Sequence, residues 1–273
     1  MVRIRGGLAL IDRHLQLKVC RCVMSIWKVH IDPWCLLTDS LHCRADIDGA
    51  VNCVSTPHLP RFKRSQPPLY TLMPAGEVML PSDKLGEILT SSGLCPPLTR
   101  TFLETARLSH AINCAIDRGD TSIDPQSLDQ DTLLLKRDFL GASDTDQSGI
   151  TSACRMGALI YVKSLTRQMW SLLQTSKMLV QRLQTSLTGT SQEAAALPLL
   201  VWLFFMGGIA SEQKTQERRW FTDNLVKVTS SLDRPSRWKC VRRFLKEVLW
   251  IDAIHDGPGE ALWHETETLR EAI

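Results

Sequence analysis

The feature that most constrains the fold is Ala194–Ala210, which runs for 17 residues without a charged side chain. A stretch this apolar has to leave water, either inside a protein core or inside a bilayer. Pro198, Gly207 and Gly208 shorten its best helical part to about ten residues, whereas a membrane span needs about 20. We therefore expect a buried apolar helix near 197–210 and keep a membrane-associated protein, anchored by this stretch, as an alternative.

Apolar residues elsewhere recur three and four positions apart, as they do on the buried face of a helix. The pattern is clearest over 153–165 and 172–187. Almost no segment alternates apolar and polar residues with period two, which is the pattern of a half-buried strand. With 44% hydrophobic and 22% charged residues, the composition is that of an ordinary globular protein. The prediction is an all-α, multi-helix fold.

Composition divides the chain into four segments. Residues 1–54 are predicted to form a helical N-terminal segment. Residues 55–97 are predicted to form a proline-rich connector, because the six prolines near 55–82 rule out a continuous helix or a central strand there. A helical domain is expected over 98–252, and residues 253–273 are treated as a C-terminal tail.

Inside the helical domain we expect helices over 98–116 and 126–139, the first ending at a C-cap formed by Gly119. A further helix is expected to begin at a cap formed by Thr151 or Ser152. Five large aromatic residues of the later helices are expected in the core, namely Trp202, Trp220, Phe221, Phe244 and Trp250. The basic residues between them are expected on solvated helix faces, namely Arg218, Arg219, Arg234, Arg237, Lys239, Arg242, Arg243 and Lys246.

The cysteines give no sign of a disulfide framework or a metal centre. There are nine of them, an odd number scattered over a long chain, which indicates an intracellular, reduced protein. Cys20 and Cys22 form one close pair, but no second pair follows at the spacing of a structural zinc site. Asp144–Gly149 copies the first half of a calcium-binding loop, yet its twelfth position is Arg155, where calcium needs a carboxylate.

The sequence contains no motif of a known catalytic class: no nucleophile elbow, no phosphate-binding glycine loop and no paired-histidine metal motif. A net charge of +3 is also too small for a dedicated nucleic-acid module. We therefore predict a protein that is not an enzyme, with no catalytic, metal-binding, cofactor-binding or DNA-contacting residue. Two alternatives stay open: an unrecognised helical enzyme whose groups assemble from distant residues, and a non-functional truncated remnant.

Five short motifs stand in a recognisable order along the chain. They are Ala45–Ala50 with Pro57–Pro60, Ala153–Tyr161, Ala196–Ala210, Glu217–Phe221 and Trp238–Trp250. In this order they resemble the fungal-specific transcription factor domain, over roughly residues 30–252. The resemblance implies the helical regulatory region of fungal binuclear zinc-cluster transcription factors. Such proteins are nuclear and control pathway genes, often of metabolism or of secondary-metabolite gene clusters.

The chain departs from that family at its DNA-binding module. The family binds DNA through two cysteine triplets, each with a close pair, and the cysteines from Cys20 to Cys53 cannot be arranged in that way. We therefore expect a nuclear, regulator-like protein that acts through contacts with other regulators or co-regulators, as a homodimer or heterodimer. A small-molecule effector bound between its helices is also expected. A true start upstream of Met1, which would supply the zinc cluster, is a further explanation of why the cluster is missing from this sequence.

Overall fold

The computed structural model describes residues 37–73, 83–119, 123–141, 149–165, 173–188, 196–230 and 238–272. Within these ranges the chain is 81% helical, with ten α-helices and no strand, which confirms the all-α prediction. The elements are α2 (Leu37–Cys53), the 3-10 helix η1 (Leu69–Leu72), α3 (Asp83–Ser91), α4 (Pro96–Asp117), α5 (Pro125–Gly141), α6 (Gly149–Leu165), α7 (Leu173–Thr188), α8 (Leu197–Ala210), α9 (Gln216–Thr229), α10 (Trp238–Val248) and α11 (Asp252–Glu271).

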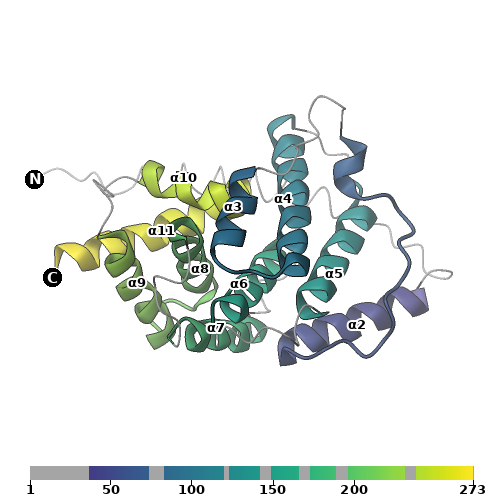
Figure 1. Ribbon diagram of the computed structural model, residues 1–273, viewed down its shortest axis with the longest axis horizontal. Coiled ribbons are helices and arrows are strands. Elements are labelled where there is room, and N and C mark those ends of the chain that lie inside the picture. The colour runs from purple at the N-terminus through teal and green to yellow at the C-terminus, as the bar shows by residue number, and fades with distance from the viewer. Residues whose placement is uncertain are drawn as a thin grey trace, which may run out of the picture.

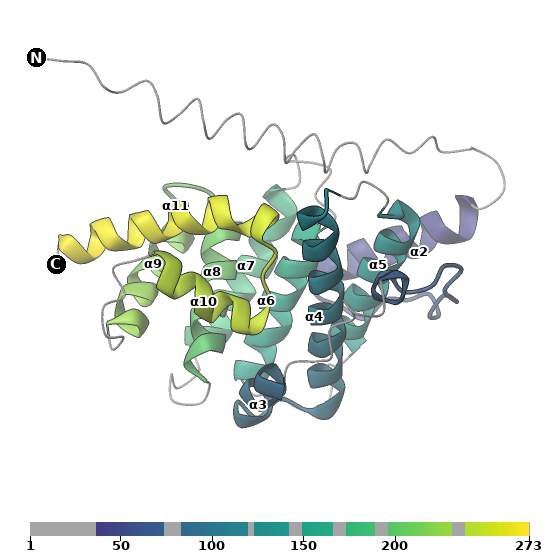
Figure 2. The same ribbon diagram turned by 90° about the horizontal axis from the view of Figure 1, so that it is seen from above.

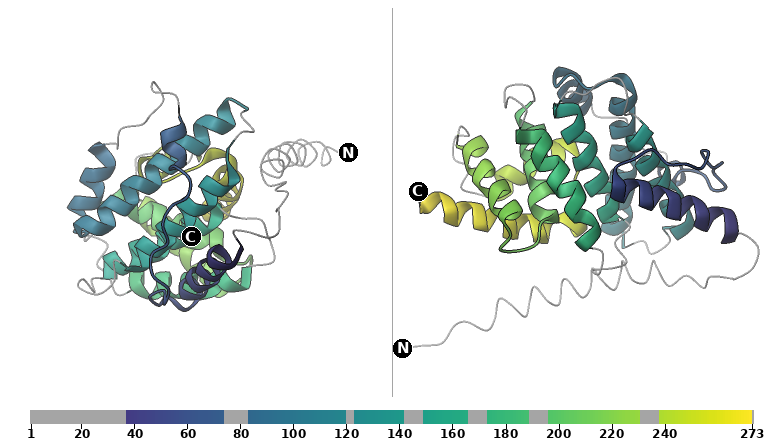
Figure 3. Two further views of the ribbon diagram at one scale, coloured as in Figure 1. Left: turned by 90° about the vertical axis from the view of Figure 1, so that its right-hand side faces the viewer. Right: turned by 90° about the horizontal axis from the view of Figure 1, so that it is seen from below.

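The helices form an elongated row, from α2 at one end to α9 and the C-terminal end of α11 at the other (Figure 1, Figure 2). Near the middle of the row, α6 packs against α5, α7 and α8. Helix α8 in turn contacts α9, α10 and α11, while α2 lies beside α5 at the opposite end (Figure 3). One continuous hydrophobic core therefore runs through the row.

Helix α8 is the apolar segment that the sequence places in the core, and this prediction is confirmed. Every residue from Leu199 to Gly208 is buried. Pro198 stands in the first turn, where its missing N–H costs no helical hydrogen bond. The Trp202 indole is fully buried, and its Nε1 donates a hydrogen bond of 2.7 Å to the backbone oxygen of Leu249. Helix α8 is thus the centre around which α9, α10 and α11 pack.

The two glycines of α8 allow its neighbours to come close. A Cβ atom on Gly207 would lie 2.2 Å from the ring of Phe221 in α9, far inside van der Waals contact. A Cβ on Gly208 would lie 2.5 Å from Leu262 in α11. A side chain at Gly207 would overlap an aromatic ring, and one at Gly208 would require Leu262 to move.

Several helix boundaries agree with the sequence. Helix α4 ends at Asp117, and Gly119 follows the C-cap residue Arg118 with a φ of +65°, the left-handed conformation expected of a glycine that ends a helix. Helix α6 begins earlier than predicted, at Gly149, so Thr151 is a buried residue of the helix and not its cap. The predicted connector of residues 55–97 is extended near its start, but it also contains α3 and the first residues of α4.

The largest correction concerns the C-terminal end of the chain. Residues 253–273 were expected to be a tail, whereas residues 252–271 form the 20-residue helix α11. Its Trp263 is 1% exposed and stacks on Phe205 of α8, with 6.3 Å between the ring centroids. Gly259 lies against the rings of Trp238 and Trp250. The helix is therefore part of the core, because packing outweighs the low helix propensity of a segment that contains Pro258.

The aromatic core prediction is right for Trp202, Phe221 and Trp250, all of which are buried. Trp220 is only partly buried, packed against the edge of the core. Phe244 was expected in the core as well, but it is half-buried on α10, whose buried residues are Val241, Leu245 and Val248.

Arg218 corrects the expectation that the basic residues of the later helices are solvated. Its side chain is 9% exposed and forms a bidentate ion pair with Glu265 of α11, at 2.7 and 2.8 Å. It also donates to the backbone oxygens of Gly208 and Ser211, at 2.9 and 3.3 Å. Arg218 therefore ties the end of α8 to α9 and α11. Its neighbour Arg219 is exposed, as predicted.

Within the described ranges, no helix has the length and apolar character needed to cross a membrane. Several features singled out in the sequence lie outside these ranges: Cys20, Cys22, the loop Asp144–Ser148, Arg234 and Arg237.

Candidate functional site

The residues that follow α2 form an extended strap across α4 and α5. The strap begins where the carboxylate of Asp46 accepts hydrogen bonds from the backbone N–H groups of His58 and Leu59, at 3.0 and 2.9 Å. Arg137 of α5 donates to the backbone oxygen of Leu59 at 2.6 Å. Proline prevents this segment from forming its own helix, so side chains of the neighbouring helices satisfy its backbone groups.

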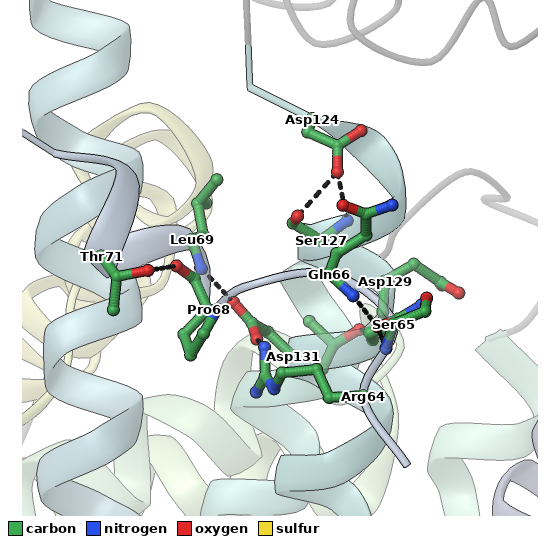
Figure 4. Close-up of polar contacts among 12 residues, drawn as sticks. Arg64, Ser65, Gln66, Pro68, Leu69, Thr71, Asp124, Ser127, Asp129 and Asp131 are labelled. Atoms are coloured by element: carbon green, nitrogen blue, oxygen red, sulfur yellow. Dashed lines mark hydrogen bonds and ion pairs between the residues drawn. The ribbon is translucent and has the colours of Figure 1, made fainter. Parts of the chain in front are cut away.

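Further along, the strap is held by polar side chains of α5 (Figure 4). The carboxylate of Asp131 accepts a hydrogen bond of 2.9 Å from the N–H of Leu69 and forms an ion pair with Arg64. The side-chain oxygen of Gln130 accepts from the N–H groups of Ser65 and Gln66, at 3.1 and 3.2 Å. Residues 58–69 are thereby fixed on the helical row, although they have no regular structure for most of their length.

A cavity of about 310 Å³ lies between this strap, α4 and α5. We call it the strap cavity. Its floor is one face of α5, because positions 131, 134, 135 and 138 are spaced three and four apart. The residues that line it are Arg61, Phe62, Arg64, Pro68, Tyr70, Glu104, Leu108, Asp131, Leu134, Leu135 and Asp138. A cavity with apolar walls and a few convergent polar groups is the usual form of a small-molecule site.

Two ion pairs stand at the cavity. Arg61 binds both carboxylate oxygens of Asp138, at 2.6 and 2.9 Å. Arg64 pairs with Asp131, whose side chain is only 5% exposed. Glu104 of α4 is the third carboxylate in the lining, and it forms no ion pair or hydrogen bond with the described residues.

All three carboxyl groups have raised pKa values, and in each case burial is the main cause. Burial raises the pKa of Asp131 against the opposing effect of the Leu69 N–H and Arg64. It raises the pKa of Asp138 against the attraction of Arg61. For Glu104, burial and then repulsion from Asp138 raise the pKa, and the attraction of Arg107, Arg61 and Arg100 only partly offsets them. Perturbed carboxyl groups that share one cavity are typical of functional sites.

A second polar cluster lies in the core, where α4, α6 and α11 meet. The hydroxyl groups of Ser109 and Tyr161 lie 2.7 Å apart, and the ring of Tyr161 stacks on His255 at 4.9 Å. The Oγ of Ser164 lies 2.9 Å from Nε2 of His255, a distance suited to a nucleophile and its base. However, the Ser164 hydroxyl donates to the Tyr161 backbone oxygen at 2.6 Å, so its proton is directed away from the imidazole. We interpret this cluster as a structural link between helices.

The described cysteines and acidic residues include no group of three or more that could hold a metal ion. Cys43 and Cys53 lie on α2, where Cys43 is half-buried and Cys53 is exposed. Burial strongly raises the pKa of Cys154 in α6, which keeps that thiol protonated and unreactive.

Sequence reasoning missed the strap cavity. It described residues 55–97 only as a proline-rich connector, whereas the structure pairs Arg61 and Arg64 of this segment with carboxylates of α5. One signal was present: Asp131 and Asp138 are seven residues apart, on the same face as apolar residues of the same helix. The fold of the strap over that face has no periodic pattern that could have revealed it.

No protein-family model matches this chain, and comparison with curated proteins and with solved structures finds no match. The likeness to the fungal-specific transcription factor domain therefore rests on the sequence motifs given above alone.

Proposed function

We propose that this chain is a helical regulatory domain similar to that of fungal zinc-cluster transcription factors, and that it acts in the nucleus through contacts with other regulators or co-regulators. In this proposal it has no DNA-reading module of its own and controls pathway genes, such as those of a metabolic or secondary-metabolite cluster, through its partner. It has no catalytic role.

The observation that supports this proposal is that the motifs of the resemblance pack against one another. Gly207, from the apolar motif, lies against Phe221 of the next motif, and Arg218 donates to the backbone oxygen of Gly208. Trp202 donates to the backbone oxygen of Leu249, in the last motif. These motifs therefore belong to one packed unit, as the proposal expects of a single regulatory domain.

The two upstream motifs also make defined contacts. Within the first motif, the carboxylate of Asp46 accepts the backbone N–H groups of His58 and Leu59. Gly157, from the second motif, lies under Leu203 of α8, where a Cβ atom would be only 2.6 Å from that side chain. The contacts between different motifs thus begin at α6, while the first motif is held together internally.

A tethering experiment tests the proposed function. The full chain is fused to a sequence-specific DNA-binding domain from an unrelated protein, and transcription from a matching reporter is measured in a fungal host. We expect reporter transcription to rise or fall relative to the DNA-binding domain alone. The untethered chain should leave the reporter unchanged and should not shift promoter DNA in an electrophoretic assay.

Two variants of the fusion serve as controls. Gly207→Val removes the space between α8 and α9 and should abolish the effect by unfolding the domain. Arg219→Met changes an exposed side chain beside it and should keep the effect. A folded, nuclear fusion protein that leaves transcription at the level of the DNA-binding domain alone would contradict the proposal.

A further inference from the structure

We propose that the strap cavity binds a small molecule that has an apolar body and one cationic amine, with the amine placed against Glu104. Binding as such does not depend on the function proposed above. Only the role of the ligand as a regulatory effector rests on that function.

The charges around the cavity favour a cation. Its lining contains three carboxylates, Glu104, Asp131 and Asp138, and two guanidinium groups, Arg61 and Arg64. Arg61 and Arg64 are each bonded to an aspartate, whereas Glu104 forms no ion pair with the described residues. Arg100 and Arg107, on the same helix as Glu104, attract its charge without bonding to it. A ligand ammonium group would give Glu104 a direct partner in a site partly shielded from water.

An anionic ligand fits the same cavity poorly. The positive charge of Arg64 is already balanced by Asp131, which also accepts the N–H of Leu69. The charge of Arg61 is balanced by the two hydrogen bonds to Asp138. An anion at either arginine would therefore lie close to a carboxylate of the same sign, which weakens its binding.

The remaining walls suit an apolar ligand body. They are formed by Phe62, Pro68, Tyr70, Leu108, Leu134 and Leu135. The ring of Tyr70 is held in place by Arg107 of α4, whose guanidinium carbon lies 5.8 Å from the ring centroid. The volume of about 310 Å³ is near the lower end of the range for ligand sites. It therefore fits a small arylalkylamine and not a large cofactor.

The test uses three probes of nearly the same shape and different charge: 2-phenylethylamine, 2-phenylethanol and phenylacetate. Binding of each to the purified full chain is measured by saturation-transfer NMR titration at pH 7.5. We expect the amine to bind at least about tenfold more tightly than the alcohol, as for a charge-assisted hydrogen bond, and phenylacetate to bind most weakly.

Two substitutions and one control locate the binding site. Glu104→Gln keeps the shape of the side chain and should remove the preference for the amine. Glu260→Gln removes the same charge from an exposed position on α11 and should leave the preference intact. Leu134→Phe narrows the cavity without changing its charge and should weaken binding of all three probes.

The proposal is overturned if phenylacetate binds best, if the three probes bind equally, if none of them binds, or if Glu104→Gln retains the preference for the amine. Each of these results is obtained without transcription, and the tethering experiment is run without any added amine. Failure of one proposal can therefore be told apart from failure of the other.

Discussion

Arg218 and Arg219 are consecutive in the sequence and experience opposite environments. Arg218 is buried in an ion pair with Glu265 and also satisfies two backbone oxygens at the end of α8, whereas Arg219 faces solvent. Since the last carbonyls of a helix have no partner within it, the guanidinium of Arg218 acts as a C-terminal cap supplied by another helix.

We predict that Arg218→Met lowers the free energy of unfolding by roughly 1–3 kcal/mol, because the Ser211 carbonyl loses its donor and the Gly208 carbonyl loses one of two. Arg219→Met is the matched control and should change it by less than about 0.5 kcal/mol. Urea unfolding followed by tryptophan fluorescence measures both values. Equal effects of the two substitutions would show that the buried ion pair has no special role.

Glu104 should make stability depend on pH in a particular direction. Its pKa is raised in the folded chain, mainly by burial, so above the ordinary range of a glutamate the folded state holds more protons than the unfolded state. Its contribution to the free energy of unfolding therefore falls as the pH rises through that range. We predict that Glu104→Gln stabilises the chain more at about pH 7 than at about pH 4.

Urea unfolding of both proteins at the two pH values tests this prediction, with Glu260→Gln as the control for general charge effects. A stability difference between Glu104→Gln and the natural sequence that is constant with pH, or larger in acid, would contradict it.

Part of this residue-scale picture could have been read from the sequence. Arg218 stands three, four and seven residues before Phe221, Thr222 and Leu225, all buried, so its spacing already placed it on the apolar face of α9. Its charge led to the opposite expectation. The partner, Glu265, lies 47 residues away, and no local pattern connects the two.

At the scale of helices, close packing at glycine is the main determinant of how α8 and α9 meet. We predict that Gly207→Ala lowers the free energy of unfolding by roughly 1–3 kcal/mol, because the new methyl group overlaps the ring of Phe221. Alanine is otherwise the better helix former, so a loss of stability in Gly207→Ala can be attributed to packing and not to helix propensity.

The matched control is Gly86→Ala, in α3. A Cβ atom at Gly86 meets nothing within 4 Å, so this substitution should stabilise the chain by roughly 0.5–1 kcal/mol. Thermal unfolding of the two variants measures both effects. If both variants were stabilised, α8 and α9 would not be as closely packed as described.

Sequence patterns predicted the helices α4, α5 and α8 well but did not predict α11. The difference has a physical cause. The first three have apolar residues at helical spacing or in a continuous run, with proline or glycine near their ends. Helix α11 contains Pro258 and Gly259 near its middle, which predict a break. Gly259 is buried against Trp238 and Trp250, and those contacts form only in the complete fold.

At the scale of the whole molecule, α11 closes one side of the core. We predict that Trp263→Ala lowers the free energy of unfolding by about 3–5 kcal/mol, the usual cost of a buried tryptophan. Trp263→Phe should cost much less, because it preserves the ring contact with Phe205 and removes an indole N–H that has no partner among the described residues.

Differential scanning calorimetry tests both substitutions, with Phe244→Ala as a comparison in which the lost ring is only half-buried. If Trp263→Ala were no more harmful than Phe244→Ala, the residues after 252 would be the dispensable tail that the sequence suggested.

The position of α8 has a consequence for how the chain folds during its synthesis. Phe205 and Gly208 are covered by Trp263 and Leu262, which are synthesised more than fifty residues later. At the usual rate of translation this is a delay of roughly 3–11 s, during which the face of α8 that α11 covers stays exposed. Nascent chains that stop short of α11 should therefore be held by chaperones or aggregate, and slower growth at lower temperature should raise the soluble yield.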